Sequence, residues 1–133
     1  MKKIIWTNGC FDVIHRGHIE CLKFAKSLGD YLIVGVDTDD RIKAAKGESR
    51  PYNTLNDRVA VLQSIRYVDE VRVFDSDETL INTVKEVAPI CFVKGSEYRG
   101  KTIIGAEYAS SIVYFDLKEG YSTTNILKKY EAK

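Results

Sequence analysis

The sequence predicts an α/β fold built on a parallel sheet. Short apolar runs alternate along the chain with segments whose apolar residues recur at helical spacing. Continuous apolar runs are typical of strands buried on both faces, and helices between such strands imply right-handed crossovers in a parallel sheet. The 133 residues, 44% of them hydrophobic, are enough for a modest core. We therefore expect one domain, residues 1–133.

Five apolar runs are the expected strands. Residues 31–36 form a continuous run, whereas residues 71–74 alternate between apolar and polar side chains. The other three runs are residues 4–6, 90–93 and 112–115. With helices between them, these strands predict a Rossmann-like, doubly wound, five-stranded parallel sheet with helices on both faces.

The helices are expected from apolar spacing and from residues that start or stop a helix. Gly29 is a candidate stop for the first helix, Asn53 can cap the second and Asp77 the third. A last helix is expected to start near residues 122–124. A basic segment, residues 41–50, has no such spacing and is expected to be a solvated loop or a mobile arm. The apolar residues that define the four helices are Ile19, Leu22, Ala25 and Leu28; Leu55, Val59, Leu62 and Ile65; Leu80, Ile81, Val84 and Val87; and Ile126, Leu127 and Tyr130.

Net charge and cysteine content narrow the class of protein. A net charge of +1 gives no general attraction to nucleic acid or to an anionic membrane, so we expect neither as a partner. The sequence has no apolar run long enough to span a bilayer and no signal-peptide pattern, which favours a cytoplasmic location. The three cysteines form no Cys-x-x-Cys pair, which fits a reduced compartment.

The first expected strand runs into the most distinctive stretch of the chain, residues 7–18. This stretch ends in His15-Arg16-Gly17-His18, where the first helix begins. A helix N-terminus offers unpaired N–H groups and the positive end of a dipole, which suits a phosphate, and Gly9 lets the backbone approach a ligand closely. Histidines three residues apart point the same way on a helical turn. Two such imidazoles can donate hydrogen bonds to the charge that develops on a transferring phosphoryl group.

Three other interpretations of this stretch stay open. The histidines can simply cap the helix or pack against it. Asp12 can add a third ligand to a zinc-binding pair of histidines, although a tetrahedral site needs three or four ligands. Cys10 can act as a nucleophile, although its neighbours form no evident Cys–His–acid arrangement.

A second polar motif, residues 120–124, precedes the last expected helix. Its Ser and Thr hydroxyls can cap that helix or bind phosphate oxygens. This motif follows an expected strand. So do the histidine-containing stretch, residues 7–18, and the polar segments 37–40 and 95–97. Because ligands of a doubly wound sheet bind beyond the carboxyl ends of the strands, we expect all these segments to form one site.

The two motifs together resemble the cytidylyltransferase-like family of nucleotidyltransferases. The resemblance rests on Asn-Gly-Cys-Phe-Asp at residues 8–12, on His-x-Gly-His, and on Ser-Thr-Thr at residues 122–124, and it covers nearly the whole chain. It implies an enzyme in which a phosphorylated sugar or polyol attacks the α-phosphorus of a nucleoside triphosphate and pyrophosphate leaves. It also implies Mg²⁺ held mainly through the phosphates, no organic cofactor, a homodimer, and a role in the synthesis of cell-surface carbohydrates.

The resemblance also assigns roles to individual residues. His15, His18 and Lys46 are expected to be catalytic, the histidines on the α-phosphate and Lys46 on the triphosphate. The residues expected to bind the acceptor are Asp12, Asp39, Lys43 and Arg58. The residues expected to bind the nucleotide are Asn8, Gly9, Cys10, Phe11, Gly17, Lys94, Gly95, Glu97, Ser122, Thr123 and Thr124.

Two groups within the family compete as the nearer relatives. Residues 46–51, 93–98 and 120–126 resemble the nucleotidyltransferase part of ADP-heptose synthases. Residues 65–71 resemble glycerol-3-phosphate cytidylyltransferases instead, although these usually have an arginine at the position of Leu117. We favour the ATP-dependent adenylyltransferase and keep the CTP-dependent enzyme as an alternative. A nucleotide-binding regulatory module without turnover is the alternative of another class.

Overall fold

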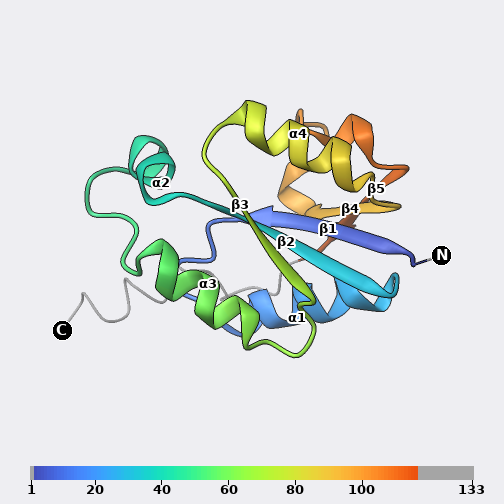
Figure 1. Ribbon diagram of the computed structural model, residues 1–133, viewed down its shortest axis with the longest axis horizontal. Helices are drawn as coiled ribbons and strands as arrows, with labels where there is room; N and C mark the ends of the chain where they lie inside the picture. The colour runs from blue at the N-terminus through green and yellow to red at the C-terminus, as the bar shows by residue number, and fades with distance from the viewer. Residues whose placement is uncertain (1, 117–133) are drawn as a thin grey trace.

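The five expected strands form one parallel sheet (Figure 1). The computed structural model describes residues 2–116. The strand order is β3-β2-β1-β4-β5, and every neighbouring pair is parallel. The strands are β1 (Ile4–Gly9), β2 (Tyr31–Asp37), β3 (Glu70–Phe74), β4 (Cys91–Gly95) and β5 (Ser111–Phe115). The predicted parallel α/β sheet is therefore confirmed, and β1 extends further than the expected residues 4–6, to Gly9.

Helices cover both faces of this sheet, as predicted. Figure 1 shows α1 and α3 on one face and α4 on the other. The α-helices within residues 2–116 are α1 (Arg16–Ser27), α2 (Asp39–Lys46), α3 (Leu55–Gln63) and α4 (Asp77–Val87), and two short 3₁₀ helices are η1 (Ser96–Tyr98) and η2 (Ala106–Tyr108). Among these residues, no helix has the length and apolar character needed to cross a membrane. The expected last helix lies outside the described residues.

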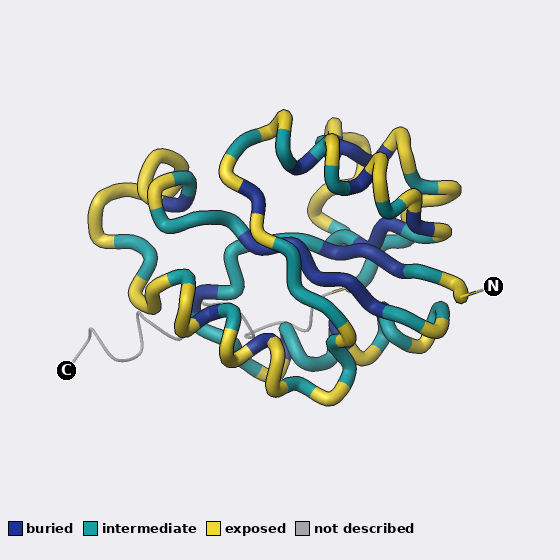
Figure 2. The backbone as a smooth tube through the Cα atoms, in the orientation of Figure 1, coloured by how far each residue is buried: buried dark blue, intermediate teal, exposed yellow. Residues whose placement is uncertain are grey.

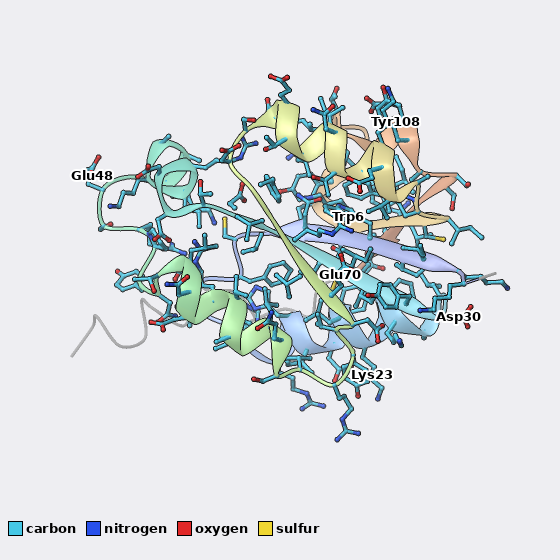
Figure 3. All side chains as sticks on the ribbon, in the orientation of Figure 1. Trp6, Lys23, Asp30, Glu48, Glu70 and Tyr108 are labelled. Atoms are coloured by element: carbon cyan, nitrogen blue, oxygen red, sulfur yellow. The ribbon has the colours of Figure 1, made fainter. Side chains whose placement is uncertain are left out.

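Within residues 2–116, the core consists of two apolar clusters, one on each face of the sheet. On β1, Ile5 packs in the cluster that contains Leu22 of α1 and Leu62 of α3, whereas Trp6 packs in the cluster that contains Leu80 and Val84 of α4. Successive residues of a strand point to opposite faces, which explains this division. Figure 2 shows the buried backbone concentrated in the central strands, and Figure 3 shows Trp6 between the sheet and α4.

Two glycines of the framework are required by close packing. A Cβ atom on Gly35 would lie 2.5 Å from the Trp6 ring, so only glycine on β2 leaves room for the buried indole. A Cβ atom on Gly29 would lie 2.5 Å from the carbonyl oxygen of Lys3. Gly29 does follow the end of α1, as expected of a residue that stops a helix. A glycine is required at this position because the backbone of Lys3 passes so close.

The two predicted side-chain caps are wrong by one residue each. Thr54, not Asn53, caps α3 by accepting a hydrogen bond from the N–H of Asp57 at 3.5 Å. Ser76 caps α4 in a capping box with Thr79, and Asp77 is the first residue of that helix. All four residue types at these positions are good caps, so residue type alone does not distinguish neighbouring positions.

Residues 39–46 form helix α2, which the sequence did not predict. Ile42 is the only buried residue of this helix, so no apolar period marks it. Its helical conformation is favoured by Asp39 and Asp40 in the first turn, by Lys43 and Lys46 in the last turn, and by two alanines between them. In Figure 1, α2 lies beyond the carboxyl ends of the strands, where a doubly wound sheet binds ligands.

Candidate active site

A cavity of about 430 Å³ opens at the carboxyl ends of the central strands. The chain leaves β1 through α1 toward β2 on one side, while β4 pairs with β1 on the other side. The sheet therefore changes its winding direction between β1 and β4, and the loops that follow these two strands separate to form the cavity. Its lining residues are Thr7, Asn8, Gly9, Cys10, Phe11, Asp12, His15, His18, Cys21, Asp37, Lys46, Arg50, Lys94, Gly95, Glu97 and Tyr98.

The two histidines form a reciprocal cap at the start of α1. Nδ1 of His15, the N-cap residue, accepts a hydrogen bond from the N–H of Gly17 at 3.0 Å. Nδ1 of His18 accepts one from the N–H of His15 at 3.1 Å. Two otherwise unpaired backbone donors are thus satisfied, as in a capping box. The ring centroids lie 4.0 Å apart, so the predicted proximity of the imidazoles is confirmed.

This cap determines which ring nitrogen holds the proton. A nitrogen that accepts an N–H bond carries a lone pair, so the proton of each neutral imidazole resides on Nε2. Burial lowers the pKa of His18 to about 4, and the neighbouring His15 and the Lys46 cation add to this effect. Burial also lowers the pKa of His15. Both rings are therefore neutral near pH 7, and each presents an Nε2–H donor.

The loop between β1 and α1 is held in an unusual backbone conformation. Phe11 has φ of 50°, in the left-handed region that residues other than glycine rarely adopt. Its ring lies beside that of His18, with the centroids 5.6 Å apart. The carbonyl oxygen of Cys10 accepts a hydrogen bond from Nη1 of Arg58 at 2.9 Å, which ties the loop to α3. Strained backbone of this kind persists where surrounding contacts hold it, and it is common at functional sites.

Asp12 anchors the segment between α2 and α3 to this loop. Its side chain is 1% exposed. Its carboxylate accepts hydrogen bonds from Nε of Arg50 at 2.9 Å and from the N–H groups of Tyr52 at 2.9 Å and Asn53 at 2.8 Å. Burial by itself raises the pKa of Asp12, but these backbone bonds and the Arg50 guanidinium outweigh it, and the pKa is lowered. Asp12 is thus a buried, ionised anchor.

Arg58 joins four segments through one buried guanidinium. Its residue exposure is 1%. It donates to the carbonyl oxygens of Asn53 at 3.1 Å, Cys10 at 2.9 Å and Asp37 at 2.8 Å, and to the carboxylate of Asp39 at 2.7 Å. The loop after β1, the end of β2, the start of α2 and the segment before α3 are therefore tied together.

Cys10, Asp37 and Lys46 meet at the α2 side of the cavity. The thiol of Cys10 donates a weak hydrogen bond to Oδ2 of Asp37 at 3.8 Å. Burial raises the pKa of this thiol, the Asp37 carboxylate raises it further, and the Lys46 cation opposes both. The thiol is therefore protonated near neutral pH, which does not suit a nucleophile. Asp37 itself is paired with Nε of Arg41 at 2.7 Å.

Lys94 and Tyr98 form the β4 side of the cavity. Nζ of Lys94 donates to the carbonyl oxygen of Asn8 at 3.3 Å and lies 4.5 Å from the centroid of the Tyr98 ring. Burial lowers the pKa of Lys94 and raises that of Tyr98. The side-chain amide of Asn8 is fixed in turn, because its Oδ1 accepts a hydrogen bond from the Trp6 indole at 3.0 Å.

Most of the expected site residues that the structure describes do line this cavity. Gly17 lies buried in the first turn of α1, where its N–H serves the cap. Asp39, Lys43 and Arg58 are not among the lining residues, and the hydrogen bonds of Arg58 are directed to protein atoms. Ser122, Thr123 and Thr124 lie outside the described residues.

Sequence reasoning did not assign a role to several residues that line the cavity. Asp37 ends β2 and lies in a segment expected near the site, and Cys21 lies one helical turn beyond His18. Arg50 belongs to the basic segment, but nothing in its spacing distinguished it from the neighbouring cations. Thr7 also lines the cavity, as does Tyr98, which belongs to the segment 94–98 that the family resemblance assigns to the nucleotide as a whole.

Within residues 2–116, no group of three or more His, Cys, Asp or Glu side chains is arranged to hold a metal ion. The Nδ1 atoms of both histidines are engaged in the helix cap. The described residues therefore give the zinc interpretation no third protein ligand.

Comparison with known proteins identifies the family. A model of cytidylyltransferase-like domains matches residues 6–129. The chain belongs to the cytidylyltransferase-like family. The family that the two motifs predicted is thereby confirmed, and the match extends over both of them.

Similar proteins support membership of this family. The bifunctional protein HldE of Campylobacter concisus is 43% identical over 128 residues, which are 96% of this chain and 27% of that protein. The protein of the same name from Helicobacter hepaticus is 45% identical over 130 residues, 98% of this chain and 27% of that protein. The chain thus spans just over a quarter of the length of these curated relatives.

Two solved structures have a similar fold. A lipopolysaccharide core biosynthesis protein from Thermoplasma volcanium superposes with a TM-score of 0.73 at 27% identity, over 90% of this chain and all of that chain. Pantoate-beta-alanine ligase from Francisella tularensis superposes with a TM-score of 0.65 at 14% identity, over 96% of this chain and 65% of that chain. The second likeness concerns the fold alone.

Proposed function

We propose that the protein transfers the nucleotidyl group of a nucleoside triphosphate to a phosphorylated sugar, with release of pyrophosphate. The observation that carries the proposal is the pair of neutral imidazoles, His15 and His18, fixed side by side with Nε2–H donors at a cavity that Lys46 and Lys94 also line. Membership of the cytidylyltransferase-like family supports it.

The geometry suits an in-line displacement at the α-phosphorus without a covalent enzyme intermediate. The acceptor phosphate oxygen attacks, and the bond to pyrophosphate breaks on the opposite side. The Nε2–H groups of His15 and His18 donate to the α-phosphoryl oxygens as charge develops on them, and Lys46 neutralises charge on the triphosphate. Because the reciprocal cap holds the rings in place before substrate binds, little reorganisation accompanies the reaction.

Mg²⁺ is part of this proposal as an ion carried by the triphosphate. Mg²⁺ prefers carboxylate, phosphate and water oxygens, and the carboxylates of Asp37 and Glu97 line the cavity. These two side chains fit an ion that is held mainly by phosphate oxygens. When bound, Mg²⁺ would neutralise charge on the phosphates.

Within this reaction class we propose ATP as the nucleotide and heptose 1-phosphate as the acceptor. The support is the resemblance of residues 46–51 and 93–98 to ADP-heptose synthases, together with the 43–45% identity to the two HldE proteins. CTP and glycerol 3-phosphate form the second candidate pair, favoured by residues 65–71. A homodimer is also proposed from the family resemblance, and light scattering of the purified protein tests it.

A pyrophosphate-release assay tests the proposed reaction. It combines ATP, CTP, GTP and UTP in turn with heptose 1-phosphate, glycerol 3-phosphate and choline phosphate, in the presence of Mg²⁺. We expect the highest kcat/KM with ATP and heptose 1-phosphate. Preference for CTP and glycerol 3-phosphate would support the second pair. Binding of a triphosphate without pyrophosphate release from any pair would instead indicate a regulatory module.

A further inference from the structure

We propose that Arg50 binds the phosphate of the acceptor and that Asp12 positions its guanidinium for this role. The inference rests on the proposed function, because that reaction brings a phosphate monoester close to the α-phosphorus of the triphosphate. It assigns the acceptor phosphate to a residue to which the sequence had given no role.

Three described cationic side chains line the cavity, namely Lys46, Arg50 and Lys94. The two histidines there are neutral near pH 7, since burial lowers their pKa values. A triphosphate and a phosphate monoester together bring several negative charges into one space. Among the described residues, these three cations are the candidates for receiving the second substrate.

Lys94 is on the wrong side of the cavity for this role. It extends from β4, donates to the carbonyl oxygen of Asn8 at 3.3 Å and lies over the Tyr98 ring. This side presents an aromatic ring and the Gly95 backbone, which suit a nucleoside. Arg50 belongs to the segment between α2 and α3 and is bonded to Asp12, on the β2 side of β1.

Lys46 is better suited to the triphosphate. It lies in the exposed last turn of α2, and its cation affects the pKa values of both Cys10 and His18, so it reaches the space beside the reacting centre. A lysine is a mobile point charge on a long stem and can follow phosphate oxygens as they move. Arg50 is less mobile, because it is held at both its guanidinium and its backbone neighbours.

The guanidinium of Arg50 is fixed on one edge and available on the other. Nε donates to Asp12 at 2.9 Å, and Cζ lies 5.5 Å from the centroid of the Tyr52 ring. The side chain is 14% exposed, and it lines the cavity. Within residues 2–116, no hydrogen bond from its two terminal nitrogens is found. Two parallel N–H groups of this kind match the oxygens of a phosphate.

Asp12 determines where these terminal nitrogens lie. Its carboxylate is itself held by the N–H groups of Tyr52 and Asn53, so the ion pair is built on a rigid support. Because Asp12 also compensates the charge of Arg50, the pair binds through directed hydrogen bonds and attracts a polyanion less than a lone cation would. This property suits a phosphate monoester better than a triphosphate.

The variant Arg50→Gln tests the assignment in two measurements. In steady-state assays with the best substrate pair, we expect the KM for the acceptor to rise about tenfold or more, since a charge-assisted pair of hydrogen bonds is lost. In calorimetric titrations, we expect the Kd for α,β-methylene ATP to change by less than about twofold. Arg72→Gln is the matched control, because Arg72 is an arginine paired with Glu70 on the edge strand β3, outside the cavity.

Two results would overturn the assignment. A loss of α,β-methylene ATP binding in Arg50→Gln would place Arg50 on the triphosphate. An acceptor KM equal to that of the control would show that Arg50 does not bind the acceptor. If the wild-type protein releases no pyrophosphate, the proposed function has failed. The inference is then decided by titrating heptose 1-phosphate and glycerol 3-phosphate in turn into the complex with α,β-methylene ATP. At least one of them must bind, and its binding must require Arg50.

The role of Asp12 is tested by Asp12→Asn, which keeps the size of the side chain. We expect the acceptor KM to rise as in Arg50→Gln, with kcat and analogue binding nearly unchanged, and the double variant to be no worse than either single variant. A lower melting temperature with an unchanged acceptor KM would show that Asp12 is only structural.

Discussion

His15 and His18 each accept a backbone N–H at Nδ1, with their rings 4.0 Å apart. The hydrogen bonds that start α1 are therefore the same ones that leave an Nε2–H donor on each ring. Helix capping and phosphate binding, which the sequence offers as separate interpretations, thus use opposite edges of the same imidazoles. A histidine pair in this position serves the fold and the proposed chemistry at once.

Two substitutions of His18 separate these functions. The amide of Asn places an acceptor near Nδ1, so His18→Asn should keep the cap. Its free energy of unfolding should stay within about 0.5 kcal/mol of the wild-type value. Its kcat should fall by a factor of about 10² to 10³. The longer Gln places its amide near Nε2, so His18→Gln should retain more turnover and lose about 1 kcal/mol of stability. Urea unfolding and pyrophosphate release measure both effects. Equal kcat values in the two variants would contradict the assignment of capping to Nδ1 and of catalysis to Nε2–H.

The neutral state of His18 predicts how stability depends on pH. The pKa of His18 is lowered from 6.5 to about 4 in the folded protein, so the unfolded chain takes up a proton first as the pH falls. The free energy of unfolding is therefore unaffected above pH 6.5 and decreases between pH 6.5 and about 4, by about 3 kcal/mol. The lowered pKa of His15 acts in the same direction.

His18→Asn provides the control for this pH effect, because it lacks the titrating ring and keeps all the carboxylates. Urea unfolding at several pH values between 7 and 4.5 should show a steeper loss of stability in wild type than in the variant. Parallel curves would mean that His18 titrates at the same pH in the folded and unfolded chains.

Cys10 provides a prediction about the type of catalysis. Burial and the Asp37 carboxylate raise the pKa of its thiol, so a covalent intermediate on sulfur is not expected. Cys10→Ser should keep kcat within about one order of magnitude of wild type, since the carbonyl oxygen that Arg58 binds is unchanged. Turnover assays measure this, and slow alkylation of Cys10 by iodoacetamide at pH 7.5 checks the thiol itself. Loss of all turnover would favour the nucleophile.

The sheet and the histidine motif were predictable because their signals are local. Strands such as residues 31–36 are apolar runs, and the spacing of His15 and His18 follows from one helical turn. Helix α2 was missed because Ile42 is its only buried residue and gives no period. Caps were misplaced by one residue because hydrogen-bond geometry decides between Asn53 and Thr54.

The roles of Asp12 and Arg58 depend on contacts between distant residues, which the sequence does not display. Asp12 meets Arg50 across 38 positions, and Arg58 meets the Cys10 carbonyl across 48. A family pattern can mark such residues as important. It does not indicate whether they touch substrate or hold the residues that do.

Arg58 gives the sharpest test of this structural network. Arg58→Met keeps much of the volume but leaves the carbonyl oxygens of Cys10, Asp37 and Asn53, whose hydrogen bonds to Arg58 are partly buried, without their donors. We expect a loss of about 3 kcal/mol in the free energy of unfolding, because each unsatisfied buried acceptor costs about 1 kcal/mol or more. Arg66→Met, at an exposed arginine just beyond α3, should change stability by less than about 0.5 kcal/mol. Chemical unfolding of both variants makes the comparison. If the two lost equal stability, the guanidinium of Arg58 would not hold the four segments together.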